Sequence, residues 1–244
     1  MLTGEALEEL LGLTKQERKL FTVRNSKKAR RLIFNSSVKK GLEVVLPRYY
    51  EDKWVREIVA GRAPWIRNRL SELNSERSLL MPCTVALKAI RSSYEITYQN
   101  LEVVGISGRE KGKLLVSPVP GDIFSAPRLL QGWLQEIAVD YLPPLLDETA
   151  ESLGLSFNRA TVRGQKTRWG SCSLKGNISL NRGLLFMPPD VVDYVIHHEL
   201  THLRVLDHSP KFWKTLEKVL PRAKMLRRKL RETEKNSVPV WASV

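Results

Sequence analysis

All four histidines of this 244-residue chain lie in one short window, between His197 and His208. Within the window, His198, Glu199 and His202 form the pattern H-E-x-x-H. On a helix, residues four apart lie on one face, so two imidazoles at this spacing can bind one small cation. Glu199 can then reach a water bound to that cation, which is the arrangement of zinc hydrolases. The window therefore predicts a helix that carries a metal-dependent hydrolytic site.

His208 is the candidate for the third zinc ligand. The spacing H-E-x-x-H-x5-H matches that of metzincins, although Val205 stands where a metzincin has glycine. On a continuous helix His208 would be rotated by roughly 240° from His202, away from the metal. We therefore expect the helix to end within residues 203–207. Ser209-Pro210 is typical of a helix start, which leaves His208 in a short corner between two helices.

Two other interpretations of the histidine window stay open. H-E-x-x-H can arise by chance on a solvated helix, but the preceding residues 191–196 are mostly apolar, which favours a buried helix. A carboxylate such as Glu217 could replace His208 as third ligand, as in gluzincins, although no E-x-x-x-D follows. His197 has Thr201 four residues later, so we expect it to pack or to support the site rather than to bind metal.

The net charge of +14 is concentrated in two segments. Residues 15–40 contain ten Lys or Arg and one Glu. Residues 211–235 contain ten Lys or Arg and three Glu. These clusters indicate either an anionic partner, such as nucleic acid, nucleotide phosphates or an acidic peptide, or a solvated basic face.

The remaining composition indicates the compartment. No run approaches 18 apolar residues, so we expect no membrane span. The first residues lack the basic and apolar regions of a secretory signal. Cys83 and Cys172 make no disulfide framework, and we expect reduced thiols in a cytoplasmic protein.

Hydrophobic periodicity divides the chain into two parts. Residues 1–120 are expected to form a β-rich N-terminal region with two helices, at 51–60 and 62–74, and with strands at 84–87, 94–98, 101–104 and 114–116. The stretch from Gly108 to Gly112 is expected to be a hairpin. Proline and glycine at 118–121 mark a boundary before a catalytic part, residues 121–244, although one continuous domain is the alternative. A long helix is expected over 123–153, interrupted near Pro143-Pro144.

Several motifs of the C-terminal half resemble those of the YgjP-like family of zinc-dependent hydrolases, which are related to SprT-like and other zincin metallopeptidases. The motifs are R-W-G-S-C-S at 168–173, Gly176, Ile178, Leu180 and Asn181, Y-V-I-H-H-E-L at 194–200, His202-Leu203, and H-S-P-K-F-W at 208–213. The resemblance covers most of the chain, and the C-terminal motifs are the specific part of it.

The resemblance implies an α+β fold with a minimal zincin core: a small twisted sheet, an active-site helix and backing helices, preceded by the β-rich N-terminal region. It implies Zn²⁺ bound by His198, His202 and His208, with Glu199 as general base. It also makes Arg168, Trp169 and Asn181 candidate site-lining residues. Arg168 could stabilise an oxyanion or hold an anionic group.

Three functions remain open. The first is a zinc-dependent metallopeptidase acting on peptides or proteins. The second is a metal-dependent nucleoside triphosphate pyrophosphatase, since some YgjP-like proteins are described as nucleotide pyrophosphatases, but the acidic cluster usual for magnesium is missing from the sequence. The third is a nucleic-acid-binding protein with a structural zinc, although structural sites are usually closed and rich in cysteine.

Overall fold

The computed structural model describes residues 2–108, 112–235 and 237–243. Within them the chain forms two compact units, residues 1–80 and residues 81–243. The boundary between these two units lies before the strands at 84–117. The reason is that these strands pack on the long helix that follows them, so both belong to one core. None of the described helices is long and apolar enough to cross a membrane.

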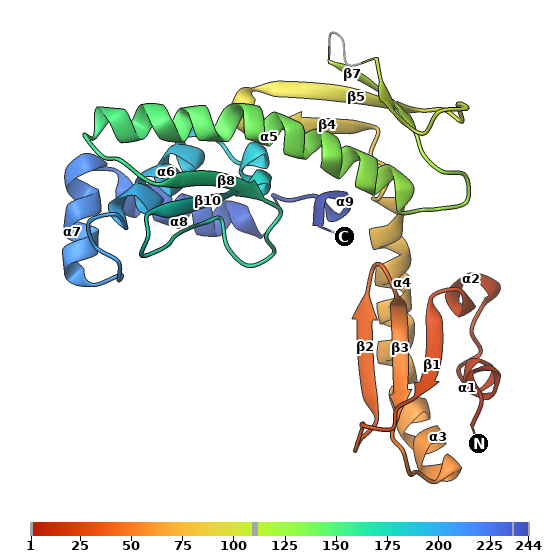
Figure 1. The fold of residues 1–244 in the computed structure, drawn as a ribbon. Coiled ribbons are helices and arrows are strands. Elements are labelled where there is room, and N and C mark those ends of the chain that lie inside the picture. Colours follow the sequence, from red (N-terminus) through yellow and green to blue (C-terminus); the bar gives the residue numbers. More distant parts are fainter. Residues whose placement is uncertain (1, 109–111, 236, 244) are drawn as a thin grey trace. The chain divides into compact units, whose positions relative to one another are not determined.

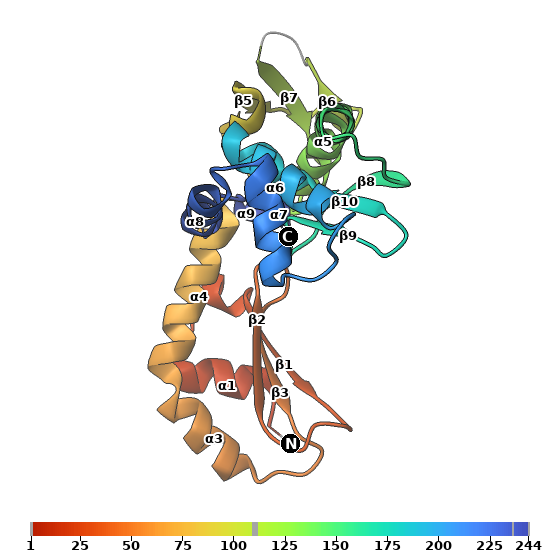
Figure 2. The ribbon, with the colours of Figure 1, turned by 90° about the vertical axis from the view of Figure 1, so that its left-hand side faces the viewer.

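The N-terminal unit is a three-stranded sheet covered by helices. Its elements in chain order are α1 (Gly4–Leu11), α2 (Lys15–Arg18), β1 (Phe21–Asn25), β2 (Ile33–Ser37), β3 (Gly41–Leu46), α3 (Asp52–Gly61) and α4 (Ala63–Ser78). The strand order is β1-β3-β2, with β1 parallel and β2 antiparallel to the central β3. Helices α1, α3 and α4 lie on one side of this sheet (Figure 2). They enclose a core of its own leucines, valines and isoleucine, among them Leu42, Val59 and Leu70.

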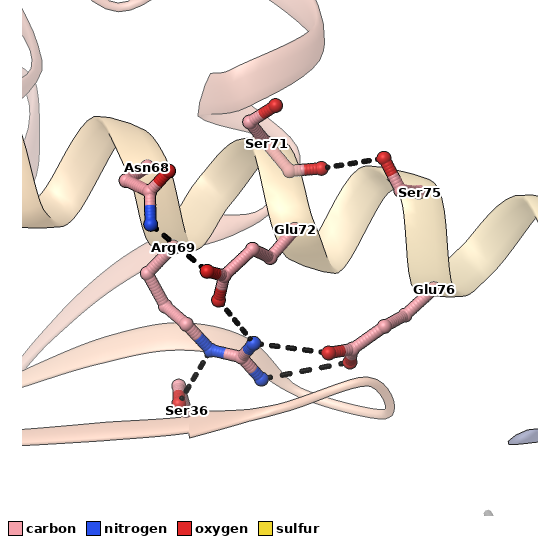
Figure 3. Close-up of polar contacts among 7 residues, drawn as sticks. All are labelled: Ser36, Asn68, Arg69, Ser71, Glu72, Ser75 and Glu76. Carbon is pink, nitrogen blue, oxygen red and sulfur yellow. Dashed lines mark hydrogen bonds and ion pairs between the residues drawn. The ribbon is translucent and has the colours of Figure 1, made fainter. Parts of the chain in front are cut away.

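Arg69 joins the last helix of this unit to the sheet. Its Nε donates to Ser36 Oγ on β2 at 3.0 Å, and its Nη1 donates to Glu72 at 2.8 Å and to Glu76 at 3.0 Å (Figure 3). These carboxylates lie one and two turns along α4, so one guanidinium holds three groups in place. The neighbouring face of α4 buries Ile66, Leu70 and Leu73 in the core.

The C-terminal unit contains two small sheets on either side of one long helix (Figure 1). The first has the order β4-β5-β7-β6, formed by Thr84–Leu87, Ser92–Tyr98, Lys113–Ser117 and Gly105–Ser107. The second has the order β8-β10-β9, formed by Arg159–Arg163, Asn177–Asn181 and Gly170–Cys172. The strand expected at 101–104 is absent, and β6 stands directly after it. The expected hairpin pairs β6 with β7, and its turn at 109–111 lies outside the described residues.

The long helix α5 (Ser125–Ser152) continues through Pro143 and Pro144, so the expected interruption is wrong. The two prolines cannot donate to the carbonyls of Val139 and Asp140, four residues earlier. Both of those residues are exposed, so water can satisfy the freed carbonyls. The other face of α5 buries Leu134, Ala138, Leu142 and Leu146. Burial of that face outweighs the two lost hydrogen bonds.

The chain ends in helices that surround the second sheet. They are the short 3-10 helix η2 (Arg182–Phe186), then α6 (Pro189–Thr201), α7 (Pro210–Val219), α8 (Ala223–Glu234) and α9 (Val240–Ser243), while η1 (Lys88–Ile90) stands earlier, after β4. Helices α6, α7 and α8 pack against one another (Figure 2). The expected α+β architecture, small sheets with a central helix and backing helices, is confirmed.

Candidate functional site

Helix α6 forms the floor of the site because most of its surface is buried. Pro189 opens the helix, where its missing N–H costs nothing, and Asp190 in the first turn receives a hydrogen bond from Lys229 of α8 at 2.5 Å. Val192, Ile196 and Leu200 are fully buried. The helix therefore cannot rotate without exposing its apolar face, and the side chains at 198, 199 and 202 are held in fixed directions.

The three histidines of the motif converge at the C-terminal end of α6. Ring nitrogens of His198, His202 and His208 all lie within 4.8 Å of one another. His198 Nε2 and His208 Nε2 are 3.0 Å apart. Helix α6 ends at Thr201, slightly earlier than expected, and α7 begins at Pro210 as expected. The corner between them returns His208 to the face that carries the other two rings.

Local contacts orient the rings. His202 Nδ1 lies 3.1 Å from the carbonyl oxygen of Val205, so it is the donating nitrogen and Nε2 is left as a lone-pair donor for a metal. Trp213 Nε1 donates to the His208 carbonyl oxygen at 3.0 Å, which fixes the corner. The ring of Phe212 contacts all three imidazoles, with centroid distances of 4.8, 4.5 and 4.9 Å.

Burial favours the uncharged form of two of the histidines, His198 and His202. Desolvation, with the nearby rings of His202 and His208, lowers the pKa of His198 to about 3. Desolvation also lowers the pKa of His202. Neutral imidazole is the form that binds a metal. The three rings offer a donor set suited to zinc, which takes three histidines and keeps one open position in catalytic sites.

Glu199 lies beside this cluster with its carboxylate buried. Its side chain is 5% exposed, and Oε2 has no hydrogen-bond partner among the described residues. Burial raises the pKa of Glu199 to about 8, and the charge of Arg168 acts in the opposite direction. A buried carboxylate oxygen without a partner costs free energy unless a ligand or water meets it. Together with the donor set, this orphaned oxygen fits a site built for a metal and its water.

Gly170 makes room for that carboxylate. A Cβ at position 170 would lie 2.6 Å from Oε1 of Glu199 and 2.7 Å from its Cγ. Strand β9, which contains Gly170, packs directly on α6 and forms an edge of its sheet. Only glycine allows the strand edge to approach the glutamate this closely.

A cleft of about 410 Å³ opens above Glu199 and the histidines. Its walls are formed by β9, α6, α7 and α8, and its lining residues are Trp169, Gly170, Tyr194, Val195, His198, Glu199, His208, Trp213, Arg227, Leu230, Arg231 and Glu234. The contribution of α8 was missed in the sequence, where these arginines belong to the basic segment 211–235. The i, i+4 spacing of Arg227 and Arg231 was the available signal.

The α8 wall is held against the histidine corner by aromatic contacts. The guanidinium of Arg227 lies over the Trp213 ring, 4.1 Å from its centroid. Trp169 Nε1 donates to Glu234 Oε2 at 3.2 Å, which ties the β9 loop to α8. Helix α8 thus contributes two arginines, Arg227 and Arg231, and one acid, Glu234, to the lining of the cleft.

The three candidate lining residues lie in different environments. Trp169 lines the cleft. Arg168 is exposed and outside the lining, although its charge reaches Glu199. Asn181 is buried away from the cleft, where its Nδ2 donates to the carbonyl oxygens of Gln165 and Arg168 at 2.7 and 2.8 Å. It therefore shapes the loop before β9 and does not line the site.

Other candidates lie outside the cluster. The group of histidines contains neither Glu217, which is exposed on α7, nor Cys172 of β9, whose pKa burial raises to about 11. His197 turns away from the cluster, with Nδ1 at 2.9 Å from the Asp193 carbonyl oxygen and 3.1 Å from its carboxylate. His197 therefore supports α6, in line with the expectation for it.

Comparisons with known proteins identify the family of the chain. Two solved structures resemble part of the chain. One is the zymogen of the metallopeptidase abylysin from Pyrococcus abyssi, which is 31% identical over 40% of this chain and 99% of its own, with a TM-score of 0.34. The other is the metallopeptidase zymogen of jannalysin from Methanocaldococcus jannaschii, which is 21% identical. That match covers 38% of this chain and 96% of the jannalysin chain, also with a TM-score of 0.34. No curated protein matched. The model of the family described as YgjP-like, metallopeptidase domain, matches residues 30–233, and the chain therefore belongs to the YgjP-like family.

Proposed function

We propose that this protein is a zinc-dependent peptidase that uses His198, His202 and His208 as metal ligands and Glu199 as general base. The observation that carries the proposal is the buried, unpartnered Glu199 oxygen beside three converging imidazoles. Zinc held there would polarise a substrate carbonyl and lower the pKa of a bound water to about 7. We expect the protein to act in the cytoplasm.

The chain's own residues would perform the proton transfers. Glu199 would accept a proton from the attacking water and deliver it to the leaving amine. Its close packing against Gly170 restricts the carboxylate to one position, which would orient it for the proton transfer. The free edge of β9 beside the cleft could bind an extended peptide by adding a strand to the sheet.

Metal content and peptide hydrolysis test the proposal together. We expect about one zinc per wild-type chain and a sharp loss in His208→Ala. Glu199→Gln should retain zinc and lose hydrolysis by about a hundred- to ten-thousand-fold, the contribution of a general base. Glu217→Gln is the matched control, since Glu217 is an exposed carboxylate outside the cluster. A folded wild type that neither contains nor takes up zinc would overturn the proposal.

The two arginines that α8 contributes to the cleft favour a second candidate, a nucleoside triphosphate pyrophosphatase. Arg227 and Arg231 could bind phosphate oxygens in the cleft that Glu199 also lines. Among the described residues, however, the three histidines form the only group of metal-ligand type, so no carboxylate cluster suited to magnesium accompanies the arginines. Casein and nucleotides, compared with and without chelator, distinguish the two functions. Chelator-sensitive release of pyrophosphate with casein left intact would select the second.

A further inference from the structure

A second polar surface lies in the N-terminal unit, at the end of its sheet. Strands β1 and β3 are parallel, so their carboxyl ends meet at the same edge, and the loops that follow them lie together (Figure 1). Backbone hydrogen bonds join these loops: Ser26 N–H donates to the Leu46 carbonyl oxygen at 2.9 Å, and Arg48 N–H to that of Ala29 at 3.4 Å. Ser26 Oγ also accepts from the Lys28 and Ala29 amides. These hydrogen bonds hold the two loops in a defined arrangement.

The two loops form adjoining clefts with a strongly basic lining. The clefts measure about 550 and 520 Å³ and share Lys27, Pro47, Arg48 and Tyr49. Lys28 and Arg30 add two more cations, all four basic side chains are exposed, and Asp52 is the single acid of either lining. Converging cations at the solvent boundary attract a polyanion and lose little hydration in doing so.

Tyr49 stands in the middle of these cations and is 79% exposed. The guanidinium of Arg48 lies 5.1 Å from the centroid of its ring. A ring this exposed contributes little to the stability of the fold, so its surface is available to stack on a ligand. Aromatic and guanidinium planes are the groups on which unpaired bases stack, whereas paired bases are already stacked in a duplex.

We propose that this surface, defined by Lys27, Lys28, Arg30, Arg48 and Tyr49, binds single-stranded nucleic acid. The cations contact consecutive phosphates, and one unpaired base stacks on Tyr49. The surface offers loops and a ring, and no helix or ribbon that would enter a major groove. The inference goes beyond the proposed peptidase function and does not depend on it, because these residues belong to the N-terminal unit.

The test is fluorescence anisotropy of labelled oligo(dT) and oligo(U) with the full chain, with and without chelator. Lys27→Ala/Lys28→Ala should weaken binding tenfold or more in about 0.1 M salt and reduce the salt slope by about 1.4, at about 0.7 per phosphate. Lys39→Ala/Lys40→Ala removes the same charge from the turn at the opposite end of the sheet and should change binding little. Chelator should have no effect.

The ring is tested separately from the charge. Tyr49→Ala should lose about five- to a hundred-fold in affinity, and Tyr49→Phe should retain it, since stacking needs the ring and not the hydroxyl. Both changes are at an exposed position, and melting curves verify that the variants fold. The proposal would be overturned if the two lysine-pair variants lost affinity equally, or if Tyr49→Ala and Tyr49→Phe bound with equal affinity. Tighter binding of a duplex, an acidic polypeptide or anionic vesicles would also overturn it.

Discussion

The histidine cleft and the basic surface around Tyr49 use ionisable groups in opposite ways. In the cleft, Glu199 and His202 are almost fully buried, and burial raises the pKa of Glu199 to about 8 and lowers that of His202. At the basic surface, Lys27, Lys28 and Arg48 are exposed to water. Burial removes hydration from a few atoms so that they can react, whereas exposure keeps charges available for attraction at a distance.

The two regions also belong to different units, whose unfolding free energies can respond to different ligands. If the two units unfold independently, a zinc ion bound to the histidines would stabilise only the unit that holds them, because a ligand contributes stability to the state it binds. The core of the N-terminal unit consists of its own residues, such as Leu42 and Leu70. A change made in one of the two regions should therefore leave the other unaffected.

Metal removal should give the largest difference. At free zinc a thousand times above the dissociation constant, binding contributes about 4 kcal/mol of unfolding free energy, and chelation should remove this from residues 81–243. Residues 1–80 should be unaffected. Hydrogen exchange read by mass spectrometry, with peptides assigned to each unit, measures both at once. Equal loss of protection in the two units would mean that they unfold as one.

Gly170→Ala should have the next largest effect, and this effect should be confined to the cleft. The added methyl group would displace Glu199, since its Cβ would lie 2.6 Å from Oε1. A displacement of about 1 Å at a reacting group costs about a hundredfold in rate. Zinc content should stay unchanged, because the three atoms nearest to an added Cβ all belong to Glu199 and none to a histidine.

Gly132→Ala is the matched control for that variant. Gly132 lies on the exposed face of α5 with nothing within 4 Å of an added Cβ. Alanine there should stabilise the helix by about 0.5–1 kcal/mol and leave hydrolysis intact. Full activity in Gly170→Ala would show that Glu199 has more freedom than its packing indicates.

The two regions also differ in how far the sequence predicts them. The pairing of His198 with His202 follows from helix periodicity, and the need to return His208 follows from the same geometry, so a local pattern predicts the cluster. The spacing of Arg227 and Arg231 indicates a shared helix face, but not that this face lines the cleft. That placement depends on how α6, α7 and α8 pack, which is a non-local property. Charge counting found both basic segments but could not separate cleft from surface.

Packing also determines other features that the local sequence pattern does not predict. Pro143 and Pro144 predict a break by local rules, and burial of the opposite face of α5 overrides them. Asn181 is the last residue of β10, and its amide holds the loop before β9. The division of the chain at residue 80 also depends on packing, since the strands after it share a core with α5.

The smallest expected effect concerns Glu43, a carboxylate of the N-terminal unit that contrasts with Glu199. Hydrogen bonds from Arg24 at 2.8 Å and Asn35 at 3.2 Å lower the pKa of Glu43 below its ordinary value of 4.5. Its partner Arg24 is half exposed, so Glu43→Gln should cost less than about 1 kcal/mol at pH 7.

The sign of the pH dependence follows from the lowered pKa. The ionised carboxylate stabilises the folded unit fully above pH 4.5, and this contribution is lost as the pH falls through the lowered pKa of the folded state. The difference between wild type and Glu43→Gln in urea unfolding should therefore shrink on acidification. Glu57→Gln on the exposed face of α3 removes the same charge as a control. A difference that grew at low pH would contradict the assignment of a stabilising ionised Glu43, and the contrast with buried Glu199 would lose its basis.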